Sequence, residues 1–504
     1  MRARLILALA LTAALSGCRA PASTPPSTPV PIDGVPGPTL FETDWRDPQP
    51  FLASLSDPQA VGALPAATVY HLDLDVSDDL ALVVGLEEVL FTNTEAAPLD
   101  QIAVHLYPNL LGGEMAVGST RVNGADVKPV YGEAEGWMMV PLGSALAPGQ
   151  SAVLRFEFRV RLPQELEFNY GVLASTSGVL AYAHGYPMIA VYDEDGWNVE
   201  LPAPYGDLTY ADSSFFLVRV HAPADLVLCG SGTELARTES NGQQDVTLAV
   251  APARDFYLAA SRDYQVAERL AGDVLLRVCS RDGTQERAER TLGIAARSLE
   301  EFGEWYGPYP YTKLDIVTIP TWAGGIEYPA AFALNELLYT PDEDFKDRSE
   351  DVFLESVTVH EVAHEWFYNL VGSDQLQDPW LDEALAQYAT LQYYEEVYGP
   401  PGAEGTLDAF NGRWERVGRA AIPIGLPVAA YDDVAYSAIV YGRGPLFFVA
   451  LEQAMGSAPF EAFLREYTAA FSWGLATPED FKALAETRCG CDLTPLFEEW
   501  VYAK

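Results

Sequence analysis

Basic residues are scarce in this chain of 504 residues: 30 lysines and arginines stand against 72 aspartates and glutamates, for a formal net charge of −42. Such a charge repels phosphate backbones, which excludes nucleic acid as a partner. Histidine and cysteine are also rare, at six and five residues, and the spacing of the cysteines excludes a Cys-x-x-Cys zinc site. Hydrophobic residues make up 49% of the chain, which excludes a disordered protein and, at this length, predicts two or three domains.

The amino-terminal residues have the pattern of an export signal. Arg2 and Arg4 precede the mostly apolar run Leu5 to Leu15, which is shorter than the roughly 20 residues that span a bilayer. The run ends in Leu-Ser-Gly before Cys18, which resembles the bacterial lipobox, where the leader is cleaved and the cysteine carries lipid. We therefore predict a signal peptide over 1–17 and a membrane-anchored lipoprotein of the bacterial cell envelope that faces the extracytoplasmic side. The alternative is a leader cleaved at Ala-x-Ala-like residues, with Cys18 unmodified.

Proline is concentrated next to this leader. Seven prolines occur between Pro21 and Pro38, with serine, threonine and glycine among them, and such a composition is typical of an extended linker. The sequence predicts a lipidated cysteine and a proline-rich tether over 18–60 that holds the folded body away from the membrane. No later run is long and charge-free enough to predict a membrane-spanning helix.

Four cysteines follow the tether, and export permits them to form disulfides. Four cysteines allow three pairings, and the sequence does not choose among them. A free buried thiol is the alternative for each. The four are Cys229, Cys279, Cys489 and Cys491.

Residues 61–268 alternate between apolar and polar side chains. From Leu154 to Leu162 every second residue is apolar and the others are charged, and Phe216, Val218 and Val220 alternate with polar residues in the same way. This period of two turns one face of each strand toward a core and the other toward water. We predict an antiparallel, β-rich amino-terminal domain of sandwich-like form.

The hydrophobic period changes after about residue 270. Apolar residues then recur at steps of four and three, at Ala288, Leu292, Ala295, Leu299, Phe302 and Tyr306. This spacing predicts a helix that begins near Thr284. Helices and a few strands alternate from there to the end, so 269–504 is predicted to be a second, mostly helical domain and the fold class to be α+β.

Two of the six histidines lie four residues apart, in the sequence HEVAH over 360–364. On a helix, His360 and His364 point to the same side, so two imidazoles can bind one metal ion with Glu361 beside an open coordination position. Nineteen residues after His364, Glu383 lies near the start of a second predicted helix, free to face the first. The alternative is a buried histidine pair on a structural helix, with Glu361 in solvent.

Two histidines and a carboxylate are the ligand set of a catalytic zinc ion that keeps its fourth position for water. Zinc lowers the pKa of that water, and Glu361 can accept the proton and pass it to the leaving amine of a peptide. The sequence therefore predicts a zinc peptidase with one Zn²⁺ per chain, bound by His360, His364 and Glu383.

These segments resemble the aminopeptidase N type of zinc metallopeptidases, the gluzincins, which include the leukotriene-hydrolase enzymes. The resemblance is carried by the sequences HEVAHEWFYNLVG over 360–372, WLDEALA over 380–386, GGIEY over 324–328 and AYSAIVYGRG over 435–444. It implies a thermolysin-like catalytic domain preceded by a saddle-like β domain.

The resemblance also implies roles for residues outside the HEVAH segment. Glu327, which follows Gly324 and Gly325, matches the glutamate that binds the free ammonium of the substrate. Tyr441 matches the tyrosine that donates a hydrogen bond to the oxyanion. Tyr436 and Arg443 lie in the same block as Tyr441 and are predicted to line the site.

The sequence departs from the family pattern in several places. Asp382 replaces asparagine and Ile326 replaces methionine, which are mild changes. In the first domain we find no counterpart of the glutamine-containing block that supplies a second anchor for the amine. Asp378 is predicted either to orient a ligand histidine or to cap the helix that carries Glu383.

The sequence thus predicts a zinc-dependent aminopeptidase that removes amino-terminal residues from peptides outside the cytoplasm. The partners expected are peptide substrates and the membrane, reached through lipid on Cys18, and the chain is expected to be a monomer. One alternative is a zinc endopeptidase with an open cleft, and another is a non-catalytic peptide-binding module on the same fold.

Overall fold

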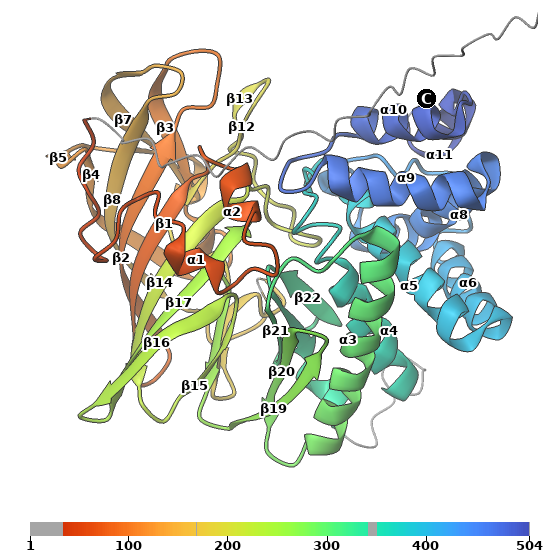
Figure 1. Cartoon of the computed structure of the whole chain (residues 1–504), viewed down its shortest axis with the longest axis horizontal. Coiled ribbons are helices and arrows are strands. Elements are labelled where there is room, and N and C mark those ends of the chain that lie inside the picture. The colour runs from red at the N-terminus through yellow and green to blue at the C-terminus, as the bar shows by residue number, and fades with distance from the viewer. Residues whose placement is uncertain (1–33, 168, 341–349, 503–504) are drawn as a thin grey trace, which may run out of the picture.

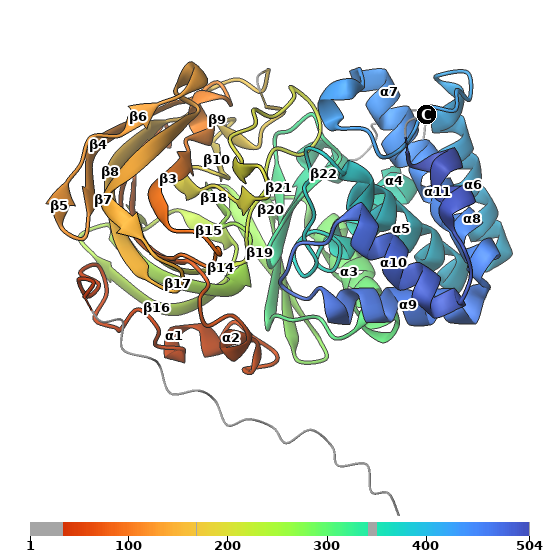
Figure 2. The same ribbon diagram turned by 90° about the horizontal axis from the view of Figure 1, so that it is seen from above.

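The computed structural model describes residues 34–167, 169–340 and 350–502 and has two parts that lie side by side (Figure 1). Strands form the amino-terminal part, and helices with one five-stranded sheet form the carboxy-terminal part. Figure 2 shows this sheet between the β-rich part and the helices. The predicted α+β fold class is therefore confirmed. The predicted signal peptide over 1–17 and Cys18 lie outside the described residues.

The largest sheet of the β-rich domain has eight strands in the order β16-β17-β14-β1-β2-β8-β4-β5. Its neighbours are antiparallel, except that β1 (Val69–Val76) and β14 (Ser214–Pro223) pair in parallel. This pair departs from the predicted antiparallel sheet because a long excursion of the chain, and no hairpin, joins the two strands. The others are β2 (Leu82–Thr92), β4 (Glu114–Val122), β5 (Ala125–Asp126), β8 (Ser151–Arg161), β16 (Thr233–Ser240) and β17 (Gln243–Ala253).

Two four-stranded sheets pack with the large sheet around one core, in the orders β11-β3-β7-β6 and β15-β18-β10-β9. Within β8, Phe156 and Phe158 are buried while Glu157 and Arg159 are exposed, as the period of two predicts. The strands of the smaller sheets and one hairpin are β3 (Leu99–His105), β6 (Val130–Tyr131), β7 (Trp137–Leu146), β9 (Leu173–Thr176), β10 (Val179–Tyr182), β11 (Met188–Ile189), β12 (Tyr192–Asp193), β13 (Gly196–Trp197), β15 (Val227–Gly230) and β18 (Leu258–Ser261).

The segment that precedes β1 is packed against the body. Trp45 and Phe51 are buried on the face of the eight-stranded sheet that lies away from the main core, and Leu55 forms a β-bridge with Tyr311 of the second domain. The predicted tether over 18–60 is therefore wrong for the residues from 34 onward, because their aromatic side chains supply apolar area that the prolines do not. Two short helices belong to this segment, α1 (Gln49–Leu52) and α2 (Ala60–Ala63).

The second domain contains a sheet in the order β19-β20-β21-β23-β22. Its first hairpin, β19 (Tyr264–Ala271) with β20 (Val274–Arg281), contains the predicted boundary between 268 and 269. The domain therefore starts near Tyr264, because an alternating pattern does not reveal to which sheet a strand belongs. The next strands are β21 (Lys313–Ile319), β22 (Gly325–Tyr328) and β23 (Ala331–Asn335), and β22 forms one edge of the sheet.

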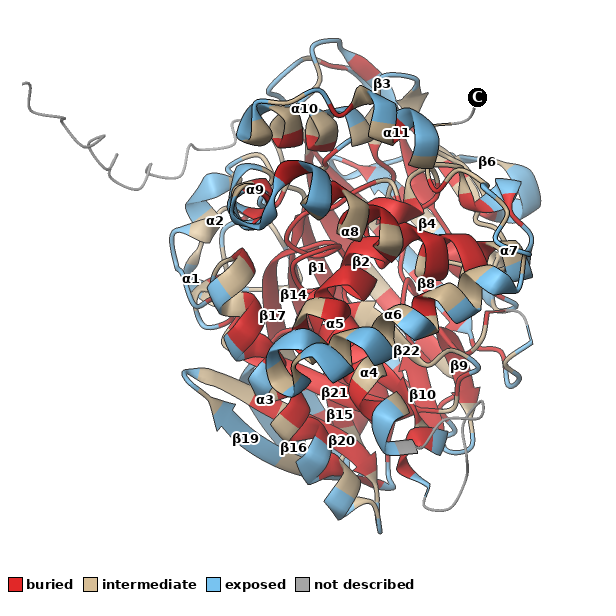
Figure 3. Ribbon diagram, turned by 90° about the vertical axis from the view of Figure 1, so that its right-hand side faces the viewer, coloured by how far each residue is buried: buried red, intermediate tan, exposed pale blue. Residues whose placement is uncertain are grey.

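Helices cover the sheet on the side away from the β-rich domain. The helix α3 (Gln285–Tyr306) begins directly after Thr284 and buries the apolar face that the sequence predicts. Figure 3 shows that the outer helices expose one face while the strands behind them are buried. The others are α4 (Glu350–Ala363), α5 (Glu383–Tyr398), α6 (Pro400–Glu415), α7 (Asp433–Ala438), α8 (Gly444–Met455), α9 (Ser457–Ala470), α10 (Pro478–Cys489) and α11 (Thr494–Trp500).

One helical stretch passes the test of length and composition for a membrane span, which the sequence pattern did not lead us to expect. Asp433–Met455 is long and apolar enough by length and composition alone, with a mean hydropathy of 1.4. However, 61% of its most apolar window is buried inside the protein. The burial indicates a core helix, whose apolar side chains face protein.

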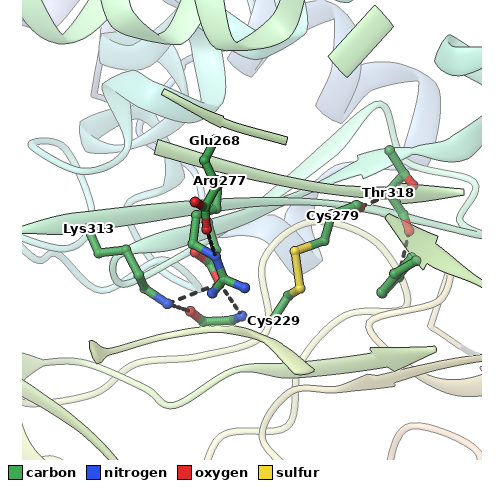
Figure 4. Close-up of a disulfide and its surroundings, with 9 residues drawn as sticks. Cys229, Glu268, Arg277, Cys279, Lys313 and Thr318 are labelled. Atoms are coloured by element: carbon green, nitrogen blue, oxygen red, sulfur yellow. Dashed lines mark hydrogen bonds and ion pairs between the residues drawn. A yellow bond between two sulfur atoms is a disulfide. The ribbon is translucent and has the colours of Figure 1, made fainter. Parts of the chain in front are cut away.

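A disulfide joins the two domains. Cys229 at β15 is bonded to Cys279 in β20 (Figure 4). Beside it, the buried carboxylate of Asp315 forms ion pairs with Lys313 at 3.0 Å and with Arg277 at 3.2 Å. A second disulfide links the neighbouring residues Cys489 and Cys491.

Candidate active site

Two buried imidazoles meet at the carboxyl end of α4. His360 lies in the last turn of this helix and His364 comes directly after it, with exposed fractions of 8% and 1%. Their Nε2 atoms are 3.2 Å apart. A spacing of four residues places both rings on one side of the helix, so the structure brings together the two predicted histidine ligands.

Glu383 completes a cluster of three ligand atoms. The 3-10 turn Pro379–Leu381 ends beside Asp382 and leads the chain into α5, whose first residue is Glu383. Its Oε2 lies 3.0 Å from Nε2 of His360 and 3.6 Å from Nε2 of His364. Burial raises the pKa of Glu383, but the hydrogen bonds of the two histidines outweigh burial and leave the pKa below its ordinary value. The third predicted ligand is therefore an ionised carboxylate.

The three atoms fit a tetrahedral zinc ion. Bonds of about 2.0 to 2.2 Å at tetrahedral angles place ligand atoms roughly 3.4 Å apart, and the separations here are 3.0, 3.2 and 3.6 Å. Two ring nitrogens that face each other also need a proton or a cation between them. A cation bound by both nitrogens and the carboxylate satisfies all three at once.

Asp382 holds the second ring nitrogen of His364. Its Oδ1 lies 2.6 Å from Nδ1, and although burial lowers the pKa of His364, Asp382 raises it above the ordinary value. Such a carboxylate fixes the tautomer and direction of a ligand histidine. The structure gives this orienting position to Asp382, which replaces the family's asparagine, and not to Asp378.

Among the described contacts, Nδ1 of His364 is bonded to Asp382 and to the carbonyl of Phe367, and not to Asp378, which lies before the 3-10 turn Pro379–Leu381. It precedes that turn without a side-chain capping bond. Burial, with the nearby charges of Asp374 and Glu479, raises the pKa of Asp378 to about 7.

Glu361 faces the edge strand β22. Its side chain is 4% exposed, and Oε2 has no hydrogen-bond partner among the described residues. Burial raises the pKa of Glu361 well above its ordinary value, while His364 opposes that shift. A Cβ atom on Gly325 would lie 2.3 Å from Oε1 of Glu361, and one on Gly324 would lie 3.2 Å from Val357 of α4. The two glycines thus let the strand approach the helix that carries the predicted base.

Glu327 lies on β22, two residues beyond Gly325. Its Oε1 accepts a hydrogen bond from Nε2 of Gln375 at 3.2 Å. The same nitrogen donates to Oδ2 of Asp382 at 2.6 Å, and Thr209 of the β-rich domain donates to Oε1 of Gln375 at 3.2 Å. Burial raises the pKa of Glu327 to about 8. Sequence reasoning missed Gln375 and Thr209, whose residue types carry no metal or catalytic signal.

A second carboxylate reaches this area from the β-rich domain. Asp207 lies in the loop before β14, and its Oδ2 is buried without a hydrogen-bond partner in the described part of the chain. Burial raises the pKa of Asp207 well above its ordinary value, and the charges of Glu327 and Glu383 raise it further. This residue is not predictable from the sequence, because Gly206-Asp207 has the composition of an ordinary turn.

Tyr441 reaches the site from a π-helical turn over Ile439–Arg443, between α7 and α8. Its hydroxyl donates a hydrogen bond to Oε1 of Glu383, and its ring centroid lies 6.0 Å from that of His360. Burial and then Glu383 raise its pKa well above the ordinary value. The predicted oxyanion donor therefore stays protonated beside the ligand cluster.

Of the two residues predicted to line the site, Tyr436 lies next to it and Arg443 does not. Tyr436 is buried, and its ring lies 5.7 Å from that of Tyr441. Arg443 instead donates to the carbonyls of Ile422, Glu499 and Trp500. It therefore fastens the carboxy-terminal segment rather than lining the site.

The second domain is similar to a known family of peptidases. Residues 290–500 match the peptidase family M1 domain. The chain is 28% identical to Aminopeptidase 2 of Candida albicans over 58% of this chain and 32% of that protein, and 24% identical to Aminopeptidase M1-B of Oryza sativa subsp. japonica over 84% and 49%. It thus spans half or less of the length of these curated relatives.

Solved structures share the two-domain arrangement. An M1 zinc metallopeptidase from Deinococcus radiodurans, a mutant bound to a Tyr-Ser-Ala substrate, superposes with a TM-score of 0.67 at 22% identity, over 86% of this chain and 94% of that one. A second structure, of an M1 zinc metallopeptidase from Deinococcus radiodurans, gives a TM-score of 0.66 at 22% identity, over 87% of this chain and 94% of that one. This likeness shows the fold of both domains.

Proposed function

We propose that the protein is a zinc-dependent aminopeptidase of the aminopeptidase N type of gluzincins. The resemblance to that family is supported by residues 290–500, which match the peptidase family M1 domain. The proposed substrates are peptides, from which the protein releases amino-terminal residues. The observation that carries the proposal is the tetrahedral spacing of three buried ligand atoms, on His360, His364 and Glu383.

The metal site would hold one Zn²⁺ through these three residues. When bound, zinc supplies a Lewis acid that makes water acidic and polarises a carbonyl oxygen. Asp382 keeps Nδ1 of His364 protonated and so leaves Nε2 free as a ligand.

Glu361 acts as the general base. Oε2 of its buried carboxylate has no hydrogen-bond partner in the described part of the protein, and burial raises its pKa. Both properties suit a group that takes a proton from water and later gives it to the leaving amine. Tyr441 keeps its proton at neutral pH and donates it in a hydrogen bond where negative charge develops on the carbonyl oxygen.

Glu327 and Asp207 bind the free amino terminus. Both carboxylates approach the cluster, one from the edge strand β22 and one from the other domain. Burial raises the pKa of each carboxyl, and an ammonium beside them balances their negative charge. The open edge of β22 offers main-chain groups to an extended peptide. Because the ammonium site lies beside the metal ligands, the bond cleaved is the first one of the chain.

The proposal also includes the location. Arg2, Arg4 and the apolar run before Cys18 support export and attachment of lipid. The protein would then trim peptides on the extracytoplasmic side of a bacterial membrane, as a monomer. Incorporation of labelled lipid into the wild-type chain, and its loss in Cys18→Ser, tests the anchor.

Metal analysis combined with a panel of aminoacyl chromogenic substrates tests the activity. The wild-type protein should contain about one zinc per chain, and Glu361→Gln should keep the zinc while turnover falls by about 10²- to 10⁴-fold. Turnover that survives this substitution removes Glu361 as the base.

Blocked peptides test the exopeptidase assignment. Acetylation of the amino terminus should stop cleavage, because an amide carries no charge for Glu327 and Asp207. Internal cleavage of an acetylated peptide at an undiminished rate would assign the protein as an endopeptidase instead.

A further inference from the structure

The two acidic groups that flank the metal ligands share one donor. Gln375 is 3% exposed, and its amide nitrogen reaches Oε1 of Glu327 at 3.2 Å and Oδ2 of Asp382 at 2.6 Å. Each of the two N–H bonds therefore serves a different carboxylate. One carboxylate belongs to the proposed ammonium site, and the other orients the ligand His364.

We propose that Gln375 is a positioning residue that couples binding of the substrate's ammonium at Glu327 to the setting of His364 through Asp382. The inference rests on the proposed function, and it adds communication between the amine site and the metal site. The path consists of four side chains in contact: Glu327, Gln375, Asp382 and His364.

The orientation of the amide is dictated by its surroundings. The amide nitrogen donates to carboxylate oxygens of Glu327 and Asp382, and the amide oxygen accepts from the hydroxyl of Thr209 at 3.2 Å. Thr209 comes from the β-rich domain, whose loop also supplies Asp207. The same domain thus contributes to the ammonium site and holds the amide that leads away from it.

The coupling arises from competition for one donor group. Without substrate, the amide is shared between the two carboxylates. When an ammonium neutralises Glu327, that carboxylate attracts the N–H less, and the amide turns toward Asp382. Asp382 then accepts more weakly from Nδ1 of His364, so the imidazole becomes a poorer electron donor to a bound metal. A peptide with a free amino terminus would thereby make its own site more electrophilic.

Cobalt substitution makes this coupling visible without turnover. Co²⁺ replaces zinc in such sites with visible absorption bands that depend on the ligand field. Isopentylamine is a suitable probe because it is an ammonium at neutral pH and carries no carboxylate or carbonyl group. At saturation it should shift the Co²⁺ bands of the wild-type protein.

Gln375→Met, which keeps the length of the side chain and removes its hydrogen bonds, should still bind isopentylamine, measured as inhibition of aminoacyl hydrolysis. Its Co²⁺ bands should no longer shift on binding. Its kcat should fall about tenfold, whereas KM changes less because Glu327 and Asp207 remain. Thr209→Val, which loosens only the far side of the amide, should show a reduced shift and serves as the milder variant should Gln375→Met fold poorly.

Gln387 provides a matched control. It is another buried glutamine against a metal ligand, with Nε2 3.2 Å from Nδ1 of His360, and it has no hydrogen bond to Glu327 among the described contacts. Gln387→Met should change the starting Co²⁺ spectrum but keep the shift caused by the amine.

The possible outcomes distinguish a failure of the proposed function from a failure of the coupling through Gln375. A wild-type protein that binds no Co²⁺ and cleaves no aminoacyl substrate contradicts the proposed function. A protein that binds Co²⁺ and cleaves such substrates, but shows no amine-induced shift in the wild type or an undiminished shift in Gln375→Met, overturns the coupling alone.

Discussion

Replacing Gly325 by alanine should displace the catalytic base by a predictable amount. The new Cβ would lie 2.3 Å from Oε1 of Glu361 and 2.5 Å from its carboxyl carbon, whereas ordinary contacts begin at 3.4 Å. The backbone of Gly325 has a negative φ, so alanine adds no strain of its own. The carboxylate must therefore retreat by about 1 Å, and a misplacement of about that size costs on the order of 100-fold in rate.

The assay is kcat on an aminoacyl chromogenic substrate, with the metal content measured on the same sample. Gly325→Ala should keep its zinc, because the three ligands lie on α4, directly after α4 and on α5, and not on β22. Gly118→Ala is a matched strand glycine whose Cβ would meet its nearest neighbour at 3.6 Å, and it should keep the wild-type rate. Wild-type kcat in Gly325→Ala would refute the placement of Glu361 against the edge strand.

Three further predictions concern the site and its surroundings. Tyr441→Phe should lower kcat by about 10²- to 10³-fold with little change in KM, because it removes one oxyanion donor; unchanged kcat would contradict that role. Removal of zinc with a chelator should lower the thermal unfolding midpoint, since a metal at about 1,000 times its Kd contributes roughly 4 kcal/mol; an unchanged midpoint would argue against a metal held by His360, His364 and Glu383. Burial raises the pKa of Asp378 to about 7 in the metal-free protein, so the contribution of this group to stability is present below pH 4 and is lost as the pH rises toward 7. The stability of Asp378→Asn relative to wild type should therefore increase between pH 5 and pH 8 in thermal melts. A difference in melting temperature between variant and wild type that is the same at pH 5 and pH 8 would exclude the raised pKa.

Local patterns were sufficient to predict the two domains. The alternation in β8 and the apolar face of α3 are properties of consecutive residues, and both appear in the structure as expected. The parallel pairing of β1 with β14 joins strands more than a hundred residues apart, and no local pattern carries that information. The segment from residue 34 departs from its prediction for a related reason, since Trp45 and Phe51 find their partners only on the finished sheet.

The metal cluster was accessible from the sequence because its spacing is helical. His360 and His364 are one turn apart, and Glu383 opens the next long helix. The parts that were missed come from other places in the fold. Asp207 belongs to a loop of the first domain, and Gln375 is recognisable only from its contacts. Asp382 was identified as a departure from the family pattern, but its role became evident only from its distance to His364.

The π-helical turn that carries Tyr441 has a consequence for the tolerance of this region to deletion. A π turn contains one residue more than an α turn, and removing a residue from an α-helix rotates the remainder of the helix by about 100°. Loss of a single residue between Ile439 and Arg443 would let α7 and α8 merge into one regular rod, with better internal hydrogen bonding. The hydroxyl of Tyr441 would then rotate away from the ligand cluster. A chain shortened by one residue here would therefore have a more stable helix and a lower catalytic rate.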